Sequence, residues 1–299
     1  MQTEVLTYYN GGVALKQKIF AVGGDVRLLH ACKSLAAKGY DVGISSCVKS
    51  NEVKREALYE GINNAEIILL GVPVSRDGVT LYAPFSEETI LLQKIAGAVG
   101  DKKTVIGGGI THGIFSCPTE DYLKRDEFAV LNAVPTAEGV LEIAMRETDF
   151  TVFKSRCLII GFGKTGKVLC KLFSDVGAHV TAASRKESDM AMSRVFGYES
   201  IRTDMISEAL HDFDIIINTV PSCILGKSEL AKIRKDALII DVASKPGGVD
   251  FASAAELSLN VIWALSLPGK VAPQTAGEII SEITVGILKE KNLKRKDEI

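Results

Sequence analysis

Short apolar runs alternate with amphipathic stretches along the whole chain of 299 residues. The run KIFAV (18–22) is followed by VRLLHACKSLAAKG (26–39), in which apolar positions recur at helical spacing. Short β-branched runs separated by helices indicate parallel strands with crossover helices. The first half predicts further strands at 40–45, 65–74, 103–109 and 127–132, and a helix near 87–98.

The second half of the chain restarts the same rhythm. RCLIIGFG (156–163) predicts a strand and a turn, and KTGKVLCKLFSDVG (164–177) predicts the helix that follows. The whole pattern therefore predicts an α/β fold class, with two Rossmann-like domains that each contain a parallel sheet. Further strands are predicted at 178–184, 214–220, 237–243 and 260–265.

Two longer amphipathic stretches predict long linker helices that join the halves. PTAEGVLEIAMRET (135–148) and PQTAGEIISEITVGILKEK (273–291) both begin with proline, which is favoured at the first position of a helix. Two domains joined in this way would leave a cleft between them. The expected organisation is an N-terminal flavodoxin- or Rossmann-like substrate domain (1–134), a linker helix (135–150), an NAD(P)-binding Rossmann domain (151–272) and a C-terminal helix (273–299) that packs back toward the first domain.

The composition narrows the class of partner. The chain is 46% hydrophobic and 24% charged, with a formal net charge of −2, so no nucleic-acid or membrane partner is expected. Its six cysteines are scattered without a C-x-x-C pair, which argues against a metal site and favours a reducing compartment. The N-terminus is too polar for a secretory signal, and no apolar run approaches the length of a membrane span. We therefore expect a cytoplasmic protein without a metal.

The turn after the first strand of the second half matches the glycine fingerprint G-x-G-x-x-G. Gly161 permits the tight turn, Gly163 lets the backbone approach a pyrophosphate, and Gly166 allows close packing of helix on strand. The first half has only VGGD (22–25), which lacks the third glycine and is interpreted as a flavodoxin-like turn. The residues expected to bind the dinucleotide are Gly161, Phe162, Gly163, Lys164, Thr165 and Gly166, with Thr219, Val220 and Pro221 from a later strand end.

The end of the next strand bears on the identity of the cofactor. An acidic residue that binds the ribose of NAD is usual about 20 residues after the fingerprint. This chain has Ser184, Arg185 and Lys186 there instead. A hydroxyl and two cations favour a 2′-phosphate, which a carboxylate would repel. We therefore expect NADP as the cofactor and leave the use of NAD open; the alternative is that these residues form a polar turn without a ligand.

The second half resembles the cofactor domain of D-2-hydroxyacid dehydrogenases. INTVPS (217–222) ends a strand with a proline-containing loop, and the next strand ends in ASKPGG (243–248). In that superfamily the second loop carries a catalytic arginine, and a catalytic histidine follows it. Here ASKPGG has no arginine and LPGKVAPQTAG (267–277) has no histidine. These differences argue against simple 2-hydroxyacid oxidation.

Six segments together resemble a more specific family. VGGDVR, NAVPTAEG, GFGKTG, NTVPS, DVASKPGGVDF and LPGKVAPQTAG, in this order and nearly end to end, resemble the dipicolinate synthase A family. The resemblance implies a sporulation enzyme in the cytoplasm of the mother cell. It would oxidise dihydrodipicolinate to dipicolinate with NADP, together with a flavoprotein-like partner, dipicolinate synthase B. It leaves open whether the chain forms a homo-oligomer.

A ring with two carboxylates requires positive groups and hydrogen-bond donors around it. Because ligands bind at the carboxyl ends of parallel strands, the candidates lie in the loops there. Histidine titrates near neutral pH, so His112 could act as the general base. Each candidate has the alternative of an exposed side chain without a role. The candidate catalytic residues are His112, Lys245 and Lys270, with both lysines in Gly/Pro loops, and the candidate substrate-binding residues are Ser75, Arg76, Thr111 and Thr136, the last at the start of the linker helix.

Two other functions stay open at this point. The chain could bind NADP in a regulatory or assembly role and leave the chemistry to its partner, or it could oxidise another carboxylated imine or amino acid. The loops SKPGG (244–248) and LPGKV (267–271) discriminate between an enzyme and a binding protein. An enzyme needs both loops to face a bound dicarboxylate.

Overall fold

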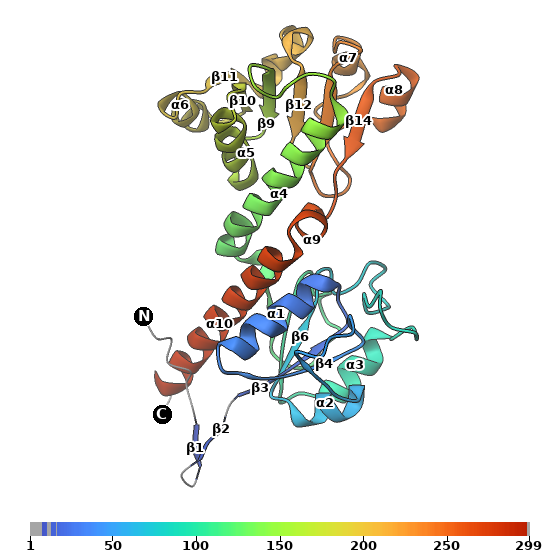
Figure 1. The fold of residues 1–299 in the computed structure, drawn as a ribbon, viewed down its shortest axis with the longest axis vertical. Coiled ribbons are helices and arrows are strands. Elements are labelled where there is room, and N and C mark those ends of the chain that lie inside the picture. Colours follow the sequence, from blue (N-terminus) through green and yellow to red (C-terminus); the bar gives the residue numbers. More distant parts are fainter. Residues whose placement is uncertain (1–7, 11–12, 16, 298–299) are drawn as a thin grey trace. The chain divides into compact units, whose positions relative to one another are not determined.

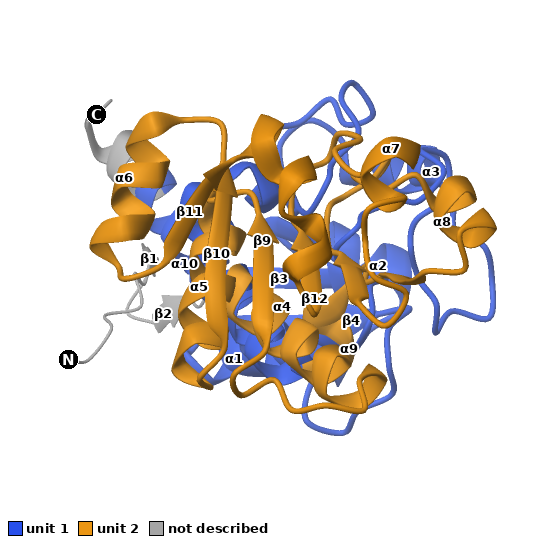
Figure 2. Cartoon of the chain, turned by 90° about the horizontal axis from the view of Figure 1, so that it is seen from above, with its two compact units in different colours: residues 1–132, 272–299 blue, residues 133–271 orange. Residues whose placement is uncertain are grey.

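The computed structural model describes residues 8–10, 13–15 and 17–297. The chain divides into two compact units, which Figure 2 colours separately: residues 1–132 with 272–299, and residues 133–271. Each unit contains a six-stranded sheet with helices packed against it. In addition, β1 (Tyr8–Asn10) and β2 (Val13–Leu15) pair antiparallel.

The sheet of the first unit is parallel throughout, in the order β5-β4-β3-β6-β7-β8. Side chains on its central strands alternate between two buried layers, so both faces are apolar. On β3, Ile19 and Ala21 belong to one layer, and Phe20 and Val22 to the other. The strands are β3 (Lys18–Val22), β4 (Asp41–Ser45), β5 (Lys54–Arg55), β6 (Ile67–Leu70), β7 (Thr104–Gly107) and β8 (Thr119–Asp121).

Helices cover both faces of this sheet. The helices α1 (Val26–Ala37) and α10 (Pro273–Asp297) lie side by side on one face (Figure 1). They approach closely at Gly277, where an added side chain would lie 2.5 Å from the Arg27 carbonyl oxygen. The C-terminal helix is thus part of the first unit. The opposite face is covered by α2 (Leu58–Asn64) and α3 (Leu92–Val99), and the 3-10 helix η1 (Tyr122–Lys124) follows β8.

The sheet of the second unit is also parallel throughout, in the order β11-β10-β9-β12-β13-β14. Two parallel-sheet units with helices confirm the predicted fold class. The strands are β9 (Arg156–Ile160), β10 (His179–Ser184), β11 (Glu199–Arg202), β12 (Ile215–Asn218), β13 (Leu238–Asp241) and β14 (Asn260–Trp263). The helix α4 (Asp126–Glu147) begins in the first unit and continues into the second. The other helices of the second unit are α5 (Lys164–Asp175), α6 (Glu187–Val195), α7 (Lys227–Leu230), α8 (Phe251–Glu256) and α9 (Leu267–Val271), with 3-10 turns η2 (Thr203–Glu208) and η3 (Leu210–Asp212).

The start of α4 differs from the prediction. The strand predicted at 127–132 is wrong because those residues are helical, and Pro135 lies inside α4 instead of at its start. Asp126 and Glu127 in the first turn favour the helix through its dipole. A run of six residues is too short for hydrophobic periodicity to separate a strand from a helical turn.

The same helix bears on the expectation that no apolar run approaches the length of a membrane span. Of the described helices, α4 alone has the length and mean hydropathy of a membrane-spanning helix, and 44% of that window is buried. Ala137, Val140 and Ala144 are fully or almost fully buried in the core of the second unit. Because a core helix passes the same test, its length and hydropathy are weak evidence for a span.

Within the two six-stranded sheets, the pattern does not predict three short strands, and all three lie at sheet edges. They are β5, β8 and β11, with the sequences KR, TED and ESIR. Edge strands are partly solvated and carry polar residues, so they lack an apolar run. The helix predicted near 87–98 begins only at Leu92.

Candidate functional site

The glycine turn lies at the carboxyl end of β9, where the strand order of the second sheet reverses. Gly161 adopts a φ of +99°, and an added side chain would overlap Thr219 Oγ1. A side chain at Gly166 would overlap the Gly161 carbonyl oxygen. The fold itself therefore requires the first and third glycines. A side chain at Gly166 would force α5 away from β9, and one at Gly161 would strain the backbone and press on the loop after β12.

The fold does not require the second glycine, Gly163. A side chain there would meet no atom within 4 Å. Gly163 is the N-cap of α5, and no side chain caps that end of the helix. The N–H groups of the first turn therefore face open space, which is the arrangement that binds phosphate groups at helix N-termini. The turn fits the pyrophosphate of a dinucleotide.

The other residues of the fingerprint differ in exposure. The ring of Phe162 is buried, with its centroid 6.5 Å from those of Phe196 and Tyr198. Only the Phe162 backbone is therefore available to a ligand. Lys164 is exposed and Thr165 is half-buried in the first turn of α5.

The loop after β12 supports this turn. Thr219 Oγ1 donates to the Ile160 carbonyl oxygen at 2.9 Å. Val220 is half-buried and Pro221 is exposed. Of the three residues predicted there, Thr219 holds the turn in place, and Pro221 has the exposure that a ligand contact requires.

A buried Asn–Asp pair was not singled out by the sequence pattern. Asn218 and Asp241 are fully buried at the ends of adjacent strands, and Asn218 Nδ2 donates to Asp241 Oδ1 at 2.8 Å. The Asp241 carboxylate also accepts the N–H groups of Ala243 at 3.0 Å and Gly248 at 2.7 Å. This network fixes the loop that carries Lys245. The sequence does carry a sign of this pair: the apolar runs III and LII are each followed directly by a polar residue, Asn218 and Asp241, which the sheet register places side by side.

Ser184 ends β10, but its hydroxyl already has partners. Ser184 is 6% exposed; its Oγ accepts the Lys186 N–H at 3.3 Å and lies 3.4 Å from Asp189 Oδ2. These contacts order the turn that displays Arg185 and Lys186, both of which are exposed. The structure therefore gives Ser184 a clear role in shaping the turn.

Arg185 lines a pocket of about 440 Å³ beside this turn. The pocket also contains Arg202, which ends β11 directly opposite Ser184 in the sheet register. Arg202 forms ion pairs at 3.0 Å with Glu187 and Asp204, so it is held in place at the pocket wall. The sequence pattern does not single out Arg202, because this residue lies on a polar edge strand. Lys186 does not line this pocket.

The glycine turn of the first unit is closed by its own chain. The Gly24 N–H donates to the Tyr82 carbonyl oxygen at 2.7 Å. Asp25 caps α1, and its carboxylate holds the buried Arg27 guanidinium at 2.7 Å. A phosphate at this helix end would have to displace these groups. The open glycine turn thus belongs to the second unit.

Two of the predicted substrate residues lie in the loop after β6. Ser75 Oγ donates to Asp77 Oδ1 at 2.9 Å and accepts the Gly78 N–H at 2.9 Å. The Asp77 carboxylate accepts hydrogen bonds from Thr80, Val79 and Ser75. These hydrogen bonds, those from Thr80 most of all, hold the pKa of Asp77 well below its usual range. Arg76 is exposed, with its guanidinium 4.3 Å from the centroid of the Tyr82 ring. Ser75 is therefore engaged in a turn, and Arg76 is accessible.

Thr111 and His112 lie together after β7. Both are exposed and line a pocket of about 440 Å³ that also contains Lys124 and Arg125. Asp121 Oδ1 accepts the Gly109 N–H at 3.0 Å and so fixes the loop that carries them. Ser75 and Arg76 do not line this pocket.

The three candidates of the second unit lie on separate elements. Lys245 is exposed in the loop after β13. The prediction of a loop at Lys270 is wrong, because Lys270 lies in α9, where it is also exposed. Thr136 lies inside α4 and not at its start, since that helix begins at Asp126.

The described residues contain no cluster of three or more His, Cys, Asp or Glu side chains that could hold a metal ion. Cys157 and Cys170 are buried as free thiols, and burial raises the pKa of each to about 12. They are neutral core residues at physiological pH. Their packing role agrees with the sequence pattern.

Two family models match the two halves of the chain. Residues 18–123 match the N-terminal domain of dipicolinate synthase A. Residues 138–248 match the NAD-binding domain of D-isomer specific 2-hydroxyacid dehydrogenases. Together with the open glycine turn, the second match supports a nicotinamide dinucleotide cofactor and an oxidoreductase.

Similar proteins cover nearly the whole chain. The chain is 30% identical over 290 residues to dipicolinate synthase A of Bacillus subtilis, spanning 91% of this chain and 96% of that protein. A crystal structure of dipicolinate synthase A from Bacillus halodurans has a TM-score of 0.83 at 27% identity, covering 91% of this chain and 97% of that one. The crystal structure of dipicolinate synthase A from Bacillus subtilis has a TM-score of 0.84 at 27% identity, covering 95% and 100%. The chain belongs to the dipicolinate synthase A family.

Proposed function

We propose that the chain is the NADP-dependent catalytic subunit of a dipicolinate synthase. It oxidises a dihydrodipicolinate to dipicolinate, with loss of one hydride and one proton from the ring. The similarity of 91% of the chain to dipicolinate synthase A carries the proposal. Aromatisation of the ring supplies driving force, so the main task of the protein is to orient a dianion and a dinucleotide.

The second unit would hold the dinucleotide, which supplies the hydride acceptor when bound. The uncapped N-terminus of α5 supports a pyrophosphate contact, and Gly163 leaves room for it. Arg185 and Arg202 in one pocket support recognition of a 2′-phosphate. We therefore propose NADP ahead of NAD.

The proposed roles in the reaction are distributed over both units. His112 is the proposed proton acceptor, with Thr111 as a neighbouring donor to the substrate. Lys245 and Lys270 are proposed to neutralise the substrate carboxylates, and Arg76 and Thr136 to orient the ring. The Asn218–Asp241 pair supports the role of Lys245, because it fixes the loop from which that side chain extends. Ser75 would act through the turn that displays Arg76.

The same proposal covers organisation and partners. The first unit is the proposed substrate domain and the second unit the cofactor domain. The proposed partner is a flavoprotein-like second subunit, dipicolinate synthase B, because the similar Bacillus subtilis protein is named as one subunit of its synthase. The proposed location is the cytoplasm of the mother cell during sporulation.

The proposal is tested with the purified chain, NADP and enzymatically generated dihydrodipicolinate, with and without the proposed partner. We expect formation of NADPH together with the near-ultraviolet absorbance of dipicolinate. NADP binding without turnover in the presence of the partner would instead identify a regulatory or assembly protein.

The cofactor preference is tested separately by binding. We expect Arg185→Ala and Arg202→Ala each to weaken NADP binding roughly tenfold and to leave NAD binding unchanged. Arg194→Ala, which removes an exposed cation of α6 outside the pocket, is the matched control. Equal losses for NADP and NAD would contradict the 2′-phosphate assignment.

A further inference from the structure

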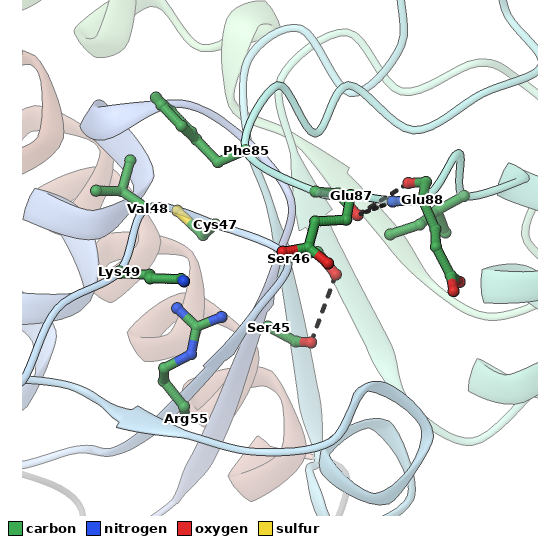
Figure 3. A pocket seen from close by; sticks show the side chains of 11 residues that line it. Ser45, Ser46, Cys47, Val48, Lys49, Arg55, Phe85, Glu87 and Glu88 are labelled. Atoms are coloured by element: carbon green, nitrogen blue, oxygen red, sulfur yellow. Dashed lines mark hydrogen bonds between the residues drawn. The ribbon is translucent and has the colours of Figure 1, made fainter.

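A cavity of about 560 Å³ in the first unit shares no lining residue with the pockets at Arg185 and His112. It is at the carboxyl ends of β4 and β5, the edge of a parallel sheet where ligands bind. Figure 3 shows its lining, which comes from two segments. Residues 45–49 and Arg55 form one wall, and residues 85–88 and Ile90 form the other.

Two cations extend into this cavity. Lys49 comes from the loop after β4 and Arg55 from β5, and both reach into the space between the labelled residues of Figure 3. Among the residues that the structure describes, neither cation has an ion-pair or hydrogen-bond partner. Two like charges in one cavity repel each other, and an anion between them would remove that cost.

Hydroxyl groups add to this cationic wall. Ser45 Oγ and Ser46 Oγ lie 3.5 Å apart at the end of β4. Ser46 adopts a φ of +55°, a left-handed conformation that is costly for a residue other than glycine. Its hydroxyl thereby lies beside that of Ser45 in the cavity lining. Cys47 behind them is a neutral thiol, because burial raises its pKa to about 11.

The opposite wall indicates the shape of the ligand. Phe85 is 49% exposed and lines the cavity together with Val48 and Ile90. Glu87 reaches toward Ser46, whereas the carboxylate of Glu88 points away (Figure 3). The cavity therefore combines two cations with a single inward carboxylate and an apolar ring. A bare phosphate would use the cations and leave Phe85 in water, while a planar ring with carboxylates would use both.

We propose that this cavity binds a small planar dicarboxylate. Lys49 and Arg55 contact its carboxylates, Ser45 and Ser46 donate hydrogen bonds to them, and Phe85 packs on the ring. The inference follows from the lining of the first unit and does not depend on the proposed function. The substrate or product of the proposed reaction and an unrelated dicarboxylate effector share this chemistry, and the experiment below separates them.

Titration calorimetry on the full chain tests the proposal. The ligands are pyridine-2,6-dicarboxylate and benzene-1,3-dicarboxylate, with pyridine-2-carboxylate and inorganic phosphate as comparators. We expect both dicarboxylates to bind at least tenfold more tightly than either comparator. Lys49→Met and Arg55→Met should each weaken dicarboxylate binding roughly tenfold and leave NADP binding unchanged. Lys94→Met, at an exposed position of α3 in the same unit, is the matched control and should change neither.

Unchanged dicarboxylate affinity in both cavity variants, or no dicarboxylate binding to the parent chain, would overturn the proposal. Steady-state kinetics then identify the source of the ligand. A KM for dihydrodipicolinate that rises in Arg55→Met as much as the dissociation constant identifies the substrate and would move its carboxylates from Lys245 and Lys270 to this cavity. An unchanged KM identifies an effector. Dicarboxylate binding without any turnover would count against the proposed function while the cavity proposal stands.

Discussion

A methyl group added at Gly166 would overlap the Gly161 carbonyl oxygen, whereas one added at Gly163 would meet no atom within 4 Å. We therefore expect Gly166→Ala to lower the free energy of unfolding by about 1–3 kcal/mol, the usual cost of overpacking. Gly163→Ala should leave it unchanged within about 0.5 kcal/mol. It should still weaken NADP binding strongly, because the methyl group takes the space of the pyrophosphate. Denaturant unfolding and NADP titration measure the two effects.

The two variants serve as controls for each other. Gly163 has a φ of −78°, which alanine adopts without strain, so any loss of NADP affinity there reports on the ligand and not on the fold. NADP binding to Gly163→Ala with the affinity of the parent chain would remove this turn from the cofactor site.

At the level of elements, the loops after β12 and β13 are held together by one buried carboxylate. Asp241→Ala would leave the Ala243 N–H and the Gly248 N–H without their acceptor, and Asn218 Nδ2 would keep only the Val220 carbonyl oxygen. Each buried group without a partner costs about 1–3 kcal/mol, so we expect a large loss of stability in urea unfolding. Asp236→Ala is the control, because its ion pair with Arg234 is exposed and such pairs contribute about 0–1 kcal/mol. Equal losses in the two variants would contradict the role of Asp241.

The contact between α1 and α10 depends on a glycine. Gly277→Ala places a methyl group 2.5 Å from the Arg27 carbonyl oxygen and from His30 Cβ, and both helices would have to move apart. We expect a loss of about 1–3 kcal/mol in the free energy of unfolding. Gly286, in the same helix, has no atom within 4 Å of an added methyl group. Gly286→Ala should stabilise the chain by up to about 1 kcal/mol through helix propensity, and calorimetric midpoints should move in opposite directions.

Some of the strands and site residues could be predicted from the sequence alone, and others could not. Strands such as IILL at β6 and LIID at β13 were predictable, because both faces of a central parallel strand are buried and the run is apolar. The edge strand β11 was not, and Arg202 was missed with it. The three glycines were predictable because their roles are local to one turn. The Asn218–Asp241 pair joins residues 23 positions apart, and only the register of the sheet brings them together.

On the scale of the whole molecule, each unit has its own core on both faces of its sheet. The helix α4 contributes to both units: Phe128 is buried in the first, and Ala137 and Val140 are buried in the second. This division gives a reason to expect that a ligand of one unit stabilises that unit more than the other.

Hydrogen exchange with and without NADP measures this difference. At a concentration 100 times the dissociation constant, NADP adds about 2.7 kcal/mol to the free energy of any opening that destroys its site. Amides of β9, β10 and β12 should therefore exchange more slowly, while those of β3, β6 and β7 keep their rates. In α4, protection should rise at Val140 and not at Phe128, because these residues belong to different cores. An equal rise in both sheets would mean that the two units open as a single cooperative structure.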